Sequence, residues 1–327
     1  METREVVVVT GASAGVGRAV VRQFARPGIG IGLLARGQEG LEAAREEVLA
    51  AGGQALAIPT DVADHRAVAA AADQVERELG PIAIWINDAM TTVFAPVSEI
   101  APEEFKRATE VTYLGTVYGT MAALHHMLPR NRGTIVQVGS ALAFRSIPLQ
   151  APYCGAKHAI VGFTDSLRTE LLHRHSKLKL TMVHLPGMNT PQFDWCKTYL
   201  PRHPQPVPPI YQPEVAARAI HWAAYHPRRQ LYVGAPTLLA IFANQVVPGL
   251  LDRYLGRSGY ASQQTAQPVP PDRPDNLFQP LPGDYGPHGA FSHRALRHSP
   301  QLWLSEHRAW MAAATLIGLA ILARRRR

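Results

Sequence analysis

Short apolar and β-branched runs alternate with longer stretches of helical periodicity from about Arg4 to Gly234. Stretches such as Leu41–Ala51 and Arg66–Leu79 place apolar residues three and four positions apart, as amphipathic helices do. This alternation predicts an α/β fold, a doubly wound parallel sheet of about seven strands with helices on both faces. The predicted strands are Glu5–Thr10, Gly30–Ala35, Gln54–Pro59, Ile82–Asn87, Gly133–Ser140, Lys179–Leu185 and Gln230–Val233.

The chain after the predicted sheet has a different pattern. Segment 186–213 holds eight prolines, so we expect a long loop or lid rather than one regular element. We therefore divide the chain into a domain of residues 1–235 that includes this lid, and a C-terminal extension. The extension comprises an apolar helical segment 236–255 broken at Pro248, a Pro-rich polar linker 256–308, and an apolar helix with an arginine tail, 309–327.

Composition excludes several classes of protein. Apolar residues make up 46% of the chain and charged residues 18%, which fits neither a disordered chain nor a polytopic membrane protein. Two cysteines, Cys154 and Cys196, are too few for a disulfide framework or a four-thiolate metal site. The first apolar run, Val6–Val9, is too short for a secretory signal. We therefore expect a cytoplasmic protein.

A glycine-rich turn follows the first predicted strand. Residues 10–17 read TGASAGVG, and a helix is predicted to begin at about Arg18. Glycines in a strand–turn–helix context allow backbone N–H groups to approach a pyrophosphate at the positive end of the helix. The pattern therefore predicts nucleotide binding, rather than an ordinary turn.

This spacing and several later motifs resemble the short-chain dehydrogenase/reductase family over roughly residues 4–234. The resemblance implies a Rossmann-type fold and an oxidoreductase with a nicotinamide cofactor. The matching motifs are Asn87-Asp88-Ala89-Met90, Ser140, Tyr153 with Lys157, Pro186-Gly187 with Thr190, and Asp61-Val62. The cofactor-binding positions that it implies are Gly11, Ser13, Gly15, Val16, Gly17, Arg36, Asp61, Val62, Asn87, Ala89, Tyr153, Lys157, Pro186, Gly187 and Thr190.

Tyr153 and Lys157 lie four residues apart on a predicted helix, so their side chains project from one face. A tyrosine of ordinary pKa near ~10 is a poor acid–base catalyst at neutral pH, and a nearby ammonium group lowers that pKa. The resemblance implies that Tyr153 exchanges a proton with the substrate oxygen, that Lys157 holds the nicotinamide ribose, and that Ser140 hydrogen-bonds the substrate oxygen.

Arg36 indicates which nicotinamide cofactor is used. An NAD-specific site carries a carboxylate at the end of the second strand, whereas this strand ends at Ala35-Arg36 and no acidic residue follows before Glu39. Arg36 can pair with the 2′-phosphate of NADP(H), with Arg18 as a second candidate. The alternative is that both arginines are ordinary surface residues.

Two departures from the family pattern bear on activity. Thr112 stands where many members have an asparagine that positions a water in a proton relay, and Met90 replaces a glycine. We therefore keep an alternative: a weakly active nucleotide-binding sensor or scaffold at the membrane. A nucleotide-sugar epimerase relative is disfavoured, because no sugar-binding domain is recognisable after Leu238.

The remaining residues refine the substrate and partners. Phe193, Trp195 and Tyr199 on the predicted lid favour an apolar ketone, aldehyde or alcohol as substrate. We expect no metal, because His125 and His126 have no partnering cysteine or acidic cluster at ligand spacing. We also expect a homo-oligomer.

The C-terminal tail concerns localisation. Trp310–Ala323 carries no charge and is followed by four arginines, which supply half of the net charge of +8. A helix of this length measures about 21 Å, less than the ~30 Å hydrocarbon core of a bilayer. The pattern favours attachment to a membrane surface, or alternatively packing on the protein or on a partner subunit. Nucleic-acid binding is disfavoured, because the excess charge is terminal.

Overall fold

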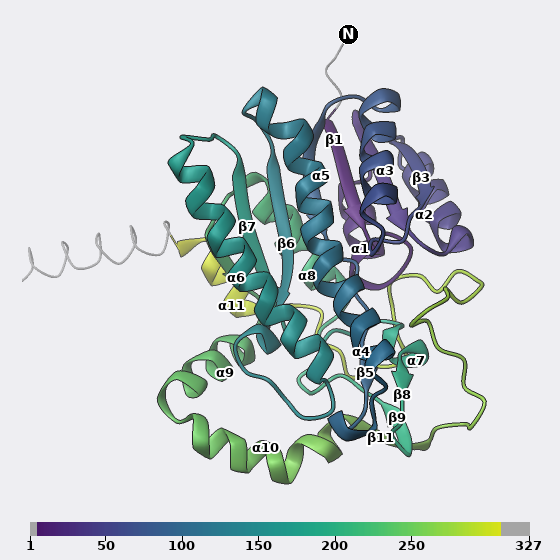
Figure 1. The fold of residues 1–327 in the computed structure, drawn as a ribbon, viewed down its shortest axis with the longest axis vertical. Helices are drawn as coiled ribbons and strands as arrows, with labels where there is room; N and C mark the ends of the chain where they lie inside the picture. The colour runs from purple at the N-terminus through teal and green to yellow at the C-terminus, as the bar shows by residue number, and fades with distance from the viewer. Residues whose placement is uncertain (1–4, 309–327) are drawn as a thin grey trace, which may run out of the picture.

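A parallel sheet of seven strands forms the centre of the computed structural model, which describes residues 5–308 (Figure 1). The strand order is β3-β2-β1-β4-β6-β7-β10, which confirms the predicted Rossmann-type α/β fold. Each predicted strand forms, with bounds within one residue of the expectation. The strands are β1 (Glu5–Thr10), β2 (Ile29–Ala35), β3 (Gln54–Pro59), β4 (Ile82–Asn87), β6 (Thr134–Ser140), β7 (Lys179–Leu185) and β10 (Gln230–Tyr232).

Helices cover both faces of this sheet (Figure 1). One face carries α1 (Gly15–Phe24), α2 (Gln38–Ala50) and α8 (Pro213–Tyr225), and the other carries α3 (His65–Glu78), α5 (Gly115–Arg130) and α6 (Ala151–His173). Each face has its own apolar cluster. Phe24 is fully buried between α1 and α8, and Trp85 is fully buried beneath α5. Strands buried on both faces explain the continuous apolar runs in the sequence.

Shorter elements gather beyond the carboxyl ends of the strands. They include β5 (Val93–Phe94), η1 (Val97–Glu99), α4 (Pro102–Thr109) and η3 (Ala141–Ala143). A π-helical turn, η2 (Glu110–Leu114), joins α4 to α5. The predicted lid forms α7 (Gln192–Trp195), β8 (Lys197–Thr198) and β9 (Arg202–Pro204), with irregular chain between them.

The extension differs from the predicted division. Its helices are α9 (Ala235–Val246) and α10 (Pro248–Ser262), so the break at Pro248 is where expected but α10 continues past the expected boundary at residue 255. Proline is well tolerated at the start of a helix, and the exposed Gly256 does not end it. β11 (Gln264–Pro268) then pairs with β9.

Residues 269–299 contain no helix or strand, but they are not a free linker. This segment follows the carboxyl edge of the sheet and leads into α11 (Pro300–Glu306), where Leu302 is buried against the core. The segment expected to be a Pro-rich polar linker therefore wraps onto the domain, where apolar anchors such as Leu277 and Phe291 are buried.

No helix between residues 5 and 308 is long and apolar enough to cross a membrane. The predicted apolar tail, residues 309–327, lies outside the residues that the structure describes.

Candidate active site

A cavity of about 240 Å³ lies at the carboxyl edge of the sheet. Residues that end or directly follow β1, β2, β3, β4, β6 and β7 line it, among them Gly11, Arg36, Asp61, Asp88 and Gly139. In open α/β sheets, ligands bind outside the carboxyl ends of the strands. The cavity is therefore the place where this fold can hold a nucleotide.

The glycine-rich turn forms one wall of the cavity, and its backbone requires glycine. Gly11 has φ +74° and Gly15 has φ +59°, a region that other L-residues rarely adopt. A side chain on Gly17 would place its Cβ 2.2 Å from the carbonyl oxygen of Gly11. The turn therefore brings Ser13, Gly15 and Val16 to the cavity at the start of α1, where it fits a dinucleotide pyrophosphate.

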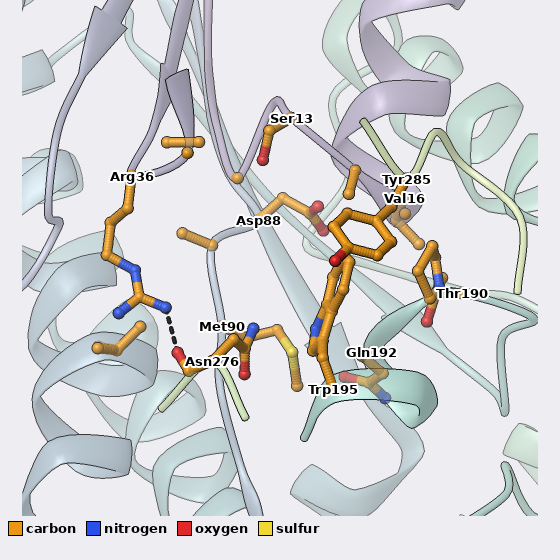
Figure 2. Close-up of a pocket in the computed structure, with 18 of the residues that line it drawn as sticks. Ser13, Val16, Arg36, Asp88, Met90, Thr190, Gln192, Trp195, Asn276 and Tyr285 are labelled. Carbon is orange, nitrogen blue, oxygen red and sulfur yellow. Dashed lines mark hydrogen bonds between the residues drawn. The ribbon is translucent and has the colours of Figure 1, made fainter. Parts of the chain in front are cut away.

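Arg36 lines the cavity at the end of β2 (Figure 2). Its guanidinium donates to the backbone carbonyls of Asn276, Leu277 and Phe278 in the C-terminal extension. Arg18, the second candidate, does not line the cavity. It is 1% exposed and bonds to Glu47 and to the carbonyl of Gly40, so it braces the turn instead of facing a ligand.

Tyr153 and Lys157 line the cavity from one face of α6. The Lys157 Nζ donates to the carbonyl of Val138 at 2.7 Å and lies 5.5 Å from the centroid of the Tyr153 ring. Burial raises the pKa of the Tyr153 phenol, and a hydrogen bond with the Ser140 side chain acts in the opposite direction. The phenol therefore keeps its proton at neutral pH and is available as a proton donor.

Asp88 is a half-buried acidic residue that the sequence motifs did not assign to the site. It follows β4, lines the cavity and points into it in Figure 2. Burial raises its pKa to about 7, while the charge of Lys157 opposes the change. Burial also lowers the pKa of Lys157 to about 8, with Asp88 opposing. Burial therefore moves the two pKa values toward each other, and both groups line the cavity together with Tyr153.

Thr112 lies in the π-helical turn and is fully buried. Its hydroxyl donates to the carbonyl of Thr91 at 2.8 Å and accepts from the N–H of Thr91 at 3.1 Å. It therefore holds the loop after β4 and is not among the residues that line the cavity. Its place in a proton relay stays a prediction.

Most of the predicted cofactor positions come together at the cavity. The lining includes Gly11, Ser13, Gly15, Val16, Arg36, Asp61, Val62, Ala89, Tyr153, Lys157, Pro186 and Thr190. Three others support the wall from behind. Gly17 packs on Gly11, Gly187 packs on the carbonyl of Val207, and the Asn87 amide donates to Thr120 and Gln137.

The structure adds lining residues that the motifs did not indicate. Leu185, Met188 and Gln192 come from the end of β7 and from the lid, and Asn276, Pro280, Leu281, Gly283 and Tyr285 come from the extension. Pro and Gly in the extension predict irregular backbone, but no local pattern says which part of the molecule that backbone reaches. These residues could only be found from the fold.

The three lid aromatics have different positions relative to the cavity. Trp195 lines the cavity and meets Tyr285 edge-on, with ring centroids 4.6 Å apart (Figure 2). Phe193 is buried behind the lid, against Phe94. Tyr199 is turned away and donates to Glu104 at 2.8 Å.

His125 and His126 lie on α5, away from the cavity. His126 Nε2 is 2.9 Å from a carboxylate oxygen of Asp73 on α3, so an acidic partner that sequence spacing did not show is present. This exposed group is separate from the residues that line the cavity.

Comparisons with known proteins agree with this geometry. A family model described as short chain dehydrogenase matches residues 5–195. The uncharacterized oxidoreductase YxnA of Bacillus subtilis is 31% identical over 276 residues, which cover 84% of this chain and 78% of that protein. The human dehydrogenase/reductase SDR family member 7 is 36% identical over 173 residues, 52% of this chain and 51% of that protein. A solved structure of an actinorhodin polyketide ketoreductase variant with NADPH has a TM-score of 0.61 at 25% identity, covering 71% of this chain and 97% of that one. The chain therefore belongs to the short-chain dehydrogenase/reductase family and is an oxidoreductase of that family.

Proposed function

We propose that this oxidoreductase uses NADP(H) to interconvert an apolar ketone or aldehyde and the corresponding alcohol. The observation that carries the proposal is the meeting of Tyr153, Lys157 and Arg36 at one cavity, with Ser140 bonded to Tyr153. Several convergent groups of this kind support a site far more strongly than any single motif.

The chemistry follows from the positions of these groups. When bound, the nicotinamide supplies or accepts the hydride at the carbinol carbon. In reduction, Tyr153 donates its phenolic proton to the substrate oxygen, and Ser140 stabilises the charge that develops there. Lys157 is fixed by the Val138 carbonyl, so its ammonium is held beside the Tyr153 ring without reorganisation.

Arg36 supports a preference for the phosphorylated cofactor. A carboxylate at the end of β2 would repel a 2′-phosphate, whereas the guanidinium of Arg36 can form a charge-assisted pair with it. The related ketoreductase structure contains NADPH, which is consistent with this choice.

The side chains beyond the nicotinamide end support an apolar substrate. Met90, Met188 and Trp195 are among the residues that line the cavity, and a buried apolar cluster includes Phe94 and the lid residue Phe193. Apolar walls with a few converging polar groups are typical of sites for small organic substrates.

We also infer attachment to an anionic membrane surface through the tail. Its uncharged run and four arginines supply the two signals that stable attachment requires. Exposed apolar residues on α9 and α10, including Leu239, Phe242 and Leu250, offer a further contact.

The test is a panel of apolar ketones and aldehydes, with NADPH oxidation followed by absorbance. Wild type should oxidise NADPH in a carbonyl-dependent way, and Tyr153→Phe should lose turnover while NADPH binding stays nearly intact, because only the proton donor is removed. Substantial turnover by Tyr153→Phe would contradict the mechanism. Binding of NADPH without turnover on any carbonyl would favour the sensor or scaffold.

A further inference from the structure

One part of the C-terminal extension borders the cofactor cavity. We call residues 273–291 the strap. Figure 2 shows Asn276 of the strap hydrogen-bonded to Arg36 on one side of the cavity, and Tyr285 of the strap beside Trp195 on the other. Pro280, Leu281 and Gly283 line the cavity between them. The strap is therefore an outer wall of the site that the extension supplies.

The strap is fixed at both ends. Arg273 donates to the backbone carbonyls of Phe193 at 2.7 Å and Cys196 at 2.8 Å, which binds the strap to the lid. The Leu277 side chain is fully buried in a small apolar cluster beside α4. At the other end, the N–H of Phe291 donates to the Asn189 side chain at 2.9 Å, and the Phe291 ring is buried.

The strap also contacts the glycine-rich turn. The carbonyl of Gly286 accepts from the N–H of Gly15 at 3.0 Å, and Asp284 pairs with Arg18 at 3.2 Å. One continuous segment thus connects the lid, the end of β2 and the turn after β1.

The contact with Arg36 is the most informative of these. A guanidinium has five N–H donors. Nη1 donates to the carbonyls of Leu277 at 3.2 Å and Phe278 at 3.0 Å, and Nη2 donates to that of Asn276. Within residues 5–308, the Nε–H and one Nη2–H remain for another acceptor. These two donors are parallel and are the pair that binds a phosphate in a bidentate manner.

The Asp275 carboxylate shapes the turn that presents these carbonyls. One oxygen accepts from the N–H of Leu277 at 3.0 Å, and the other lies 3.2 Å from Lys197 on the lid. Without this acceptor, the turn loses the bond that holds residues 275–277 in one conformation.

We propose that the strap is the specificity element of the cofactor site: its carbonyls clamp Arg36 so that the free guanidinium edge selects the 2′-phosphate of NADP(H). This inference rests on the cofactor choice in the proposed function. An arginine already fixed in its binding conformation loses less side-chain freedom when the phosphate binds, so affinity rises without a new contact. Asp275 is a positioning residue in this arrangement.

The experiment measures the Kd of NADPH and of NADH by fluorescence titration, with no substrate present. Asp275→Ala should weaken NADPH binding five- to tenfold and change the Kd of NADH less than twofold. Asp275→Asn keeps an acceptor oxygen for the Leu277 N–H and should restore most of the preference. Asp272→Ala is the matched control, because Asp272 is exposed and directly precedes the strap. Arg36→Ala gives the Kd of NADPH that is expected when the contact with the 2′-phosphate is lost.

The outcomes separate the two proposals. If wild type binds NADPH and NADH equally, the cofactor choice is wrong and the strap inference falls with it. If wild type prefers NADPH, and Arg36→Ala abolishes the preference while Asp275→Ala retains it, only the strap inference is overturned. If Asp275→Ala weakens the binding of NADPH and NADH equally, the strap inference is also overturned. The strap would then line the cavity without holding Arg36 in its binding conformation. Thermal melting shows whether each variant is folded.

Discussion

Replacing Asp88 by asparagine removes a carboxylate from the cofactor cavity and should change how stability depends on pH. Burial raises the pKa of Asp88 from its ordinary value of 3.8 to about 7. Between these values the folded protein binds more protons than the unfolded chain, so stability falls as pH rises and the loss is complete above about pH 7. At 1.36 kcal/mol for each pH unit, the carboxylate costs about 4 kcal/mol in alkaline solution.

Asp88→Asn should therefore be more stable than wild type by about 1.6 kcal/mol at pH 5 and by about 4 kcal/mol at pH 8.5, so that its advantage grows by roughly 3 kcal/mol between the two pH values. For a urea m-value of about 3 kcal/mol/M, this growth corresponds to an increase of roughly 1 M in the difference between the unfolding midpoints. Lys157 is present in both proteins, and without the Asp88 charge its pKa falls further, so the neutral amine is reached at lower pH. Urea unfolding followed by circular dichroism at both pH values is the assay.

Asp272→Asn is the control for this measurement, because it makes the same chemical change at an exposed position outside the cavity. Its unfolding midpoints should follow those of wild type at each pH. A difference between Asp88→Asn and wild type that is the same at pH 5 and pH 8.5 would refute the reasoning, because a steric effect does not titrate.

Two further predictions concern the π-helical turn and the tail. Thr112→Val should lower the free energy of unfolding by about 1–3 kcal/mol, because the Thr91 backbone loses both hydrogen bonds to the hydroxyl. It should also lower kcat if Thr112 takes part in a proton relay. Thr112→Ser keeps a hydroxyl and should restore both stability and kcat. An unchanged kcat and pH profile in Thr112→Val would exclude the relay. The full chain should sediment with liposomes that contain anionic lipid, and a chain ending at Arg308 should not, because each arginine of the tail adds roughly 1 kcal/mol near anionic headgroups. Full-length protein in the supernatant at low and high salt would refute membrane attachment.

The sheet and much of the cavity follow from local sequence patterns. Strands such as β1 and β4 have a continuous apolar run between their ends because both of their faces are buried, so the run and its length suffice to find them. The glycine-rich turn and the pair Tyr153 and Lys157 are short-range motifs, and the α/β fold brings them together at the strand ends.

Other features depend on contacts that no local pattern encodes. The titration of Asp88 comes from burial beside Lys157, which is distant in the chain. Arg18 looks like a surface residue in the sequence, yet the extension covers it through Asp284. Phe193 and Trp195 are two residues apart and similar in chemistry, and only the path of the lid decides which one lines the cavity.

The hydrogen bonds that hold Arg36 also determine when the cofactor site can assemble during synthesis of the chain. The carbonyls that hold this side chain lie 240 to 242 residues later in the chain. At roughly 5–20 residues per second, a ribosome takes on the order of 10–50 s to add them after Arg36 has been synthesised. During that interval the nascent sheet has its glycine-rich turn but no outer wall, and the apolar pocket of Val93, Ala95 and Ala108 lacks the Leu277 side chain that fills it. The extension is therefore required to complete the fold and is also part of the cofactor site. A chain interrupted before residue 277 would leave an apolar surface exposed, and this surface would favour aggregation.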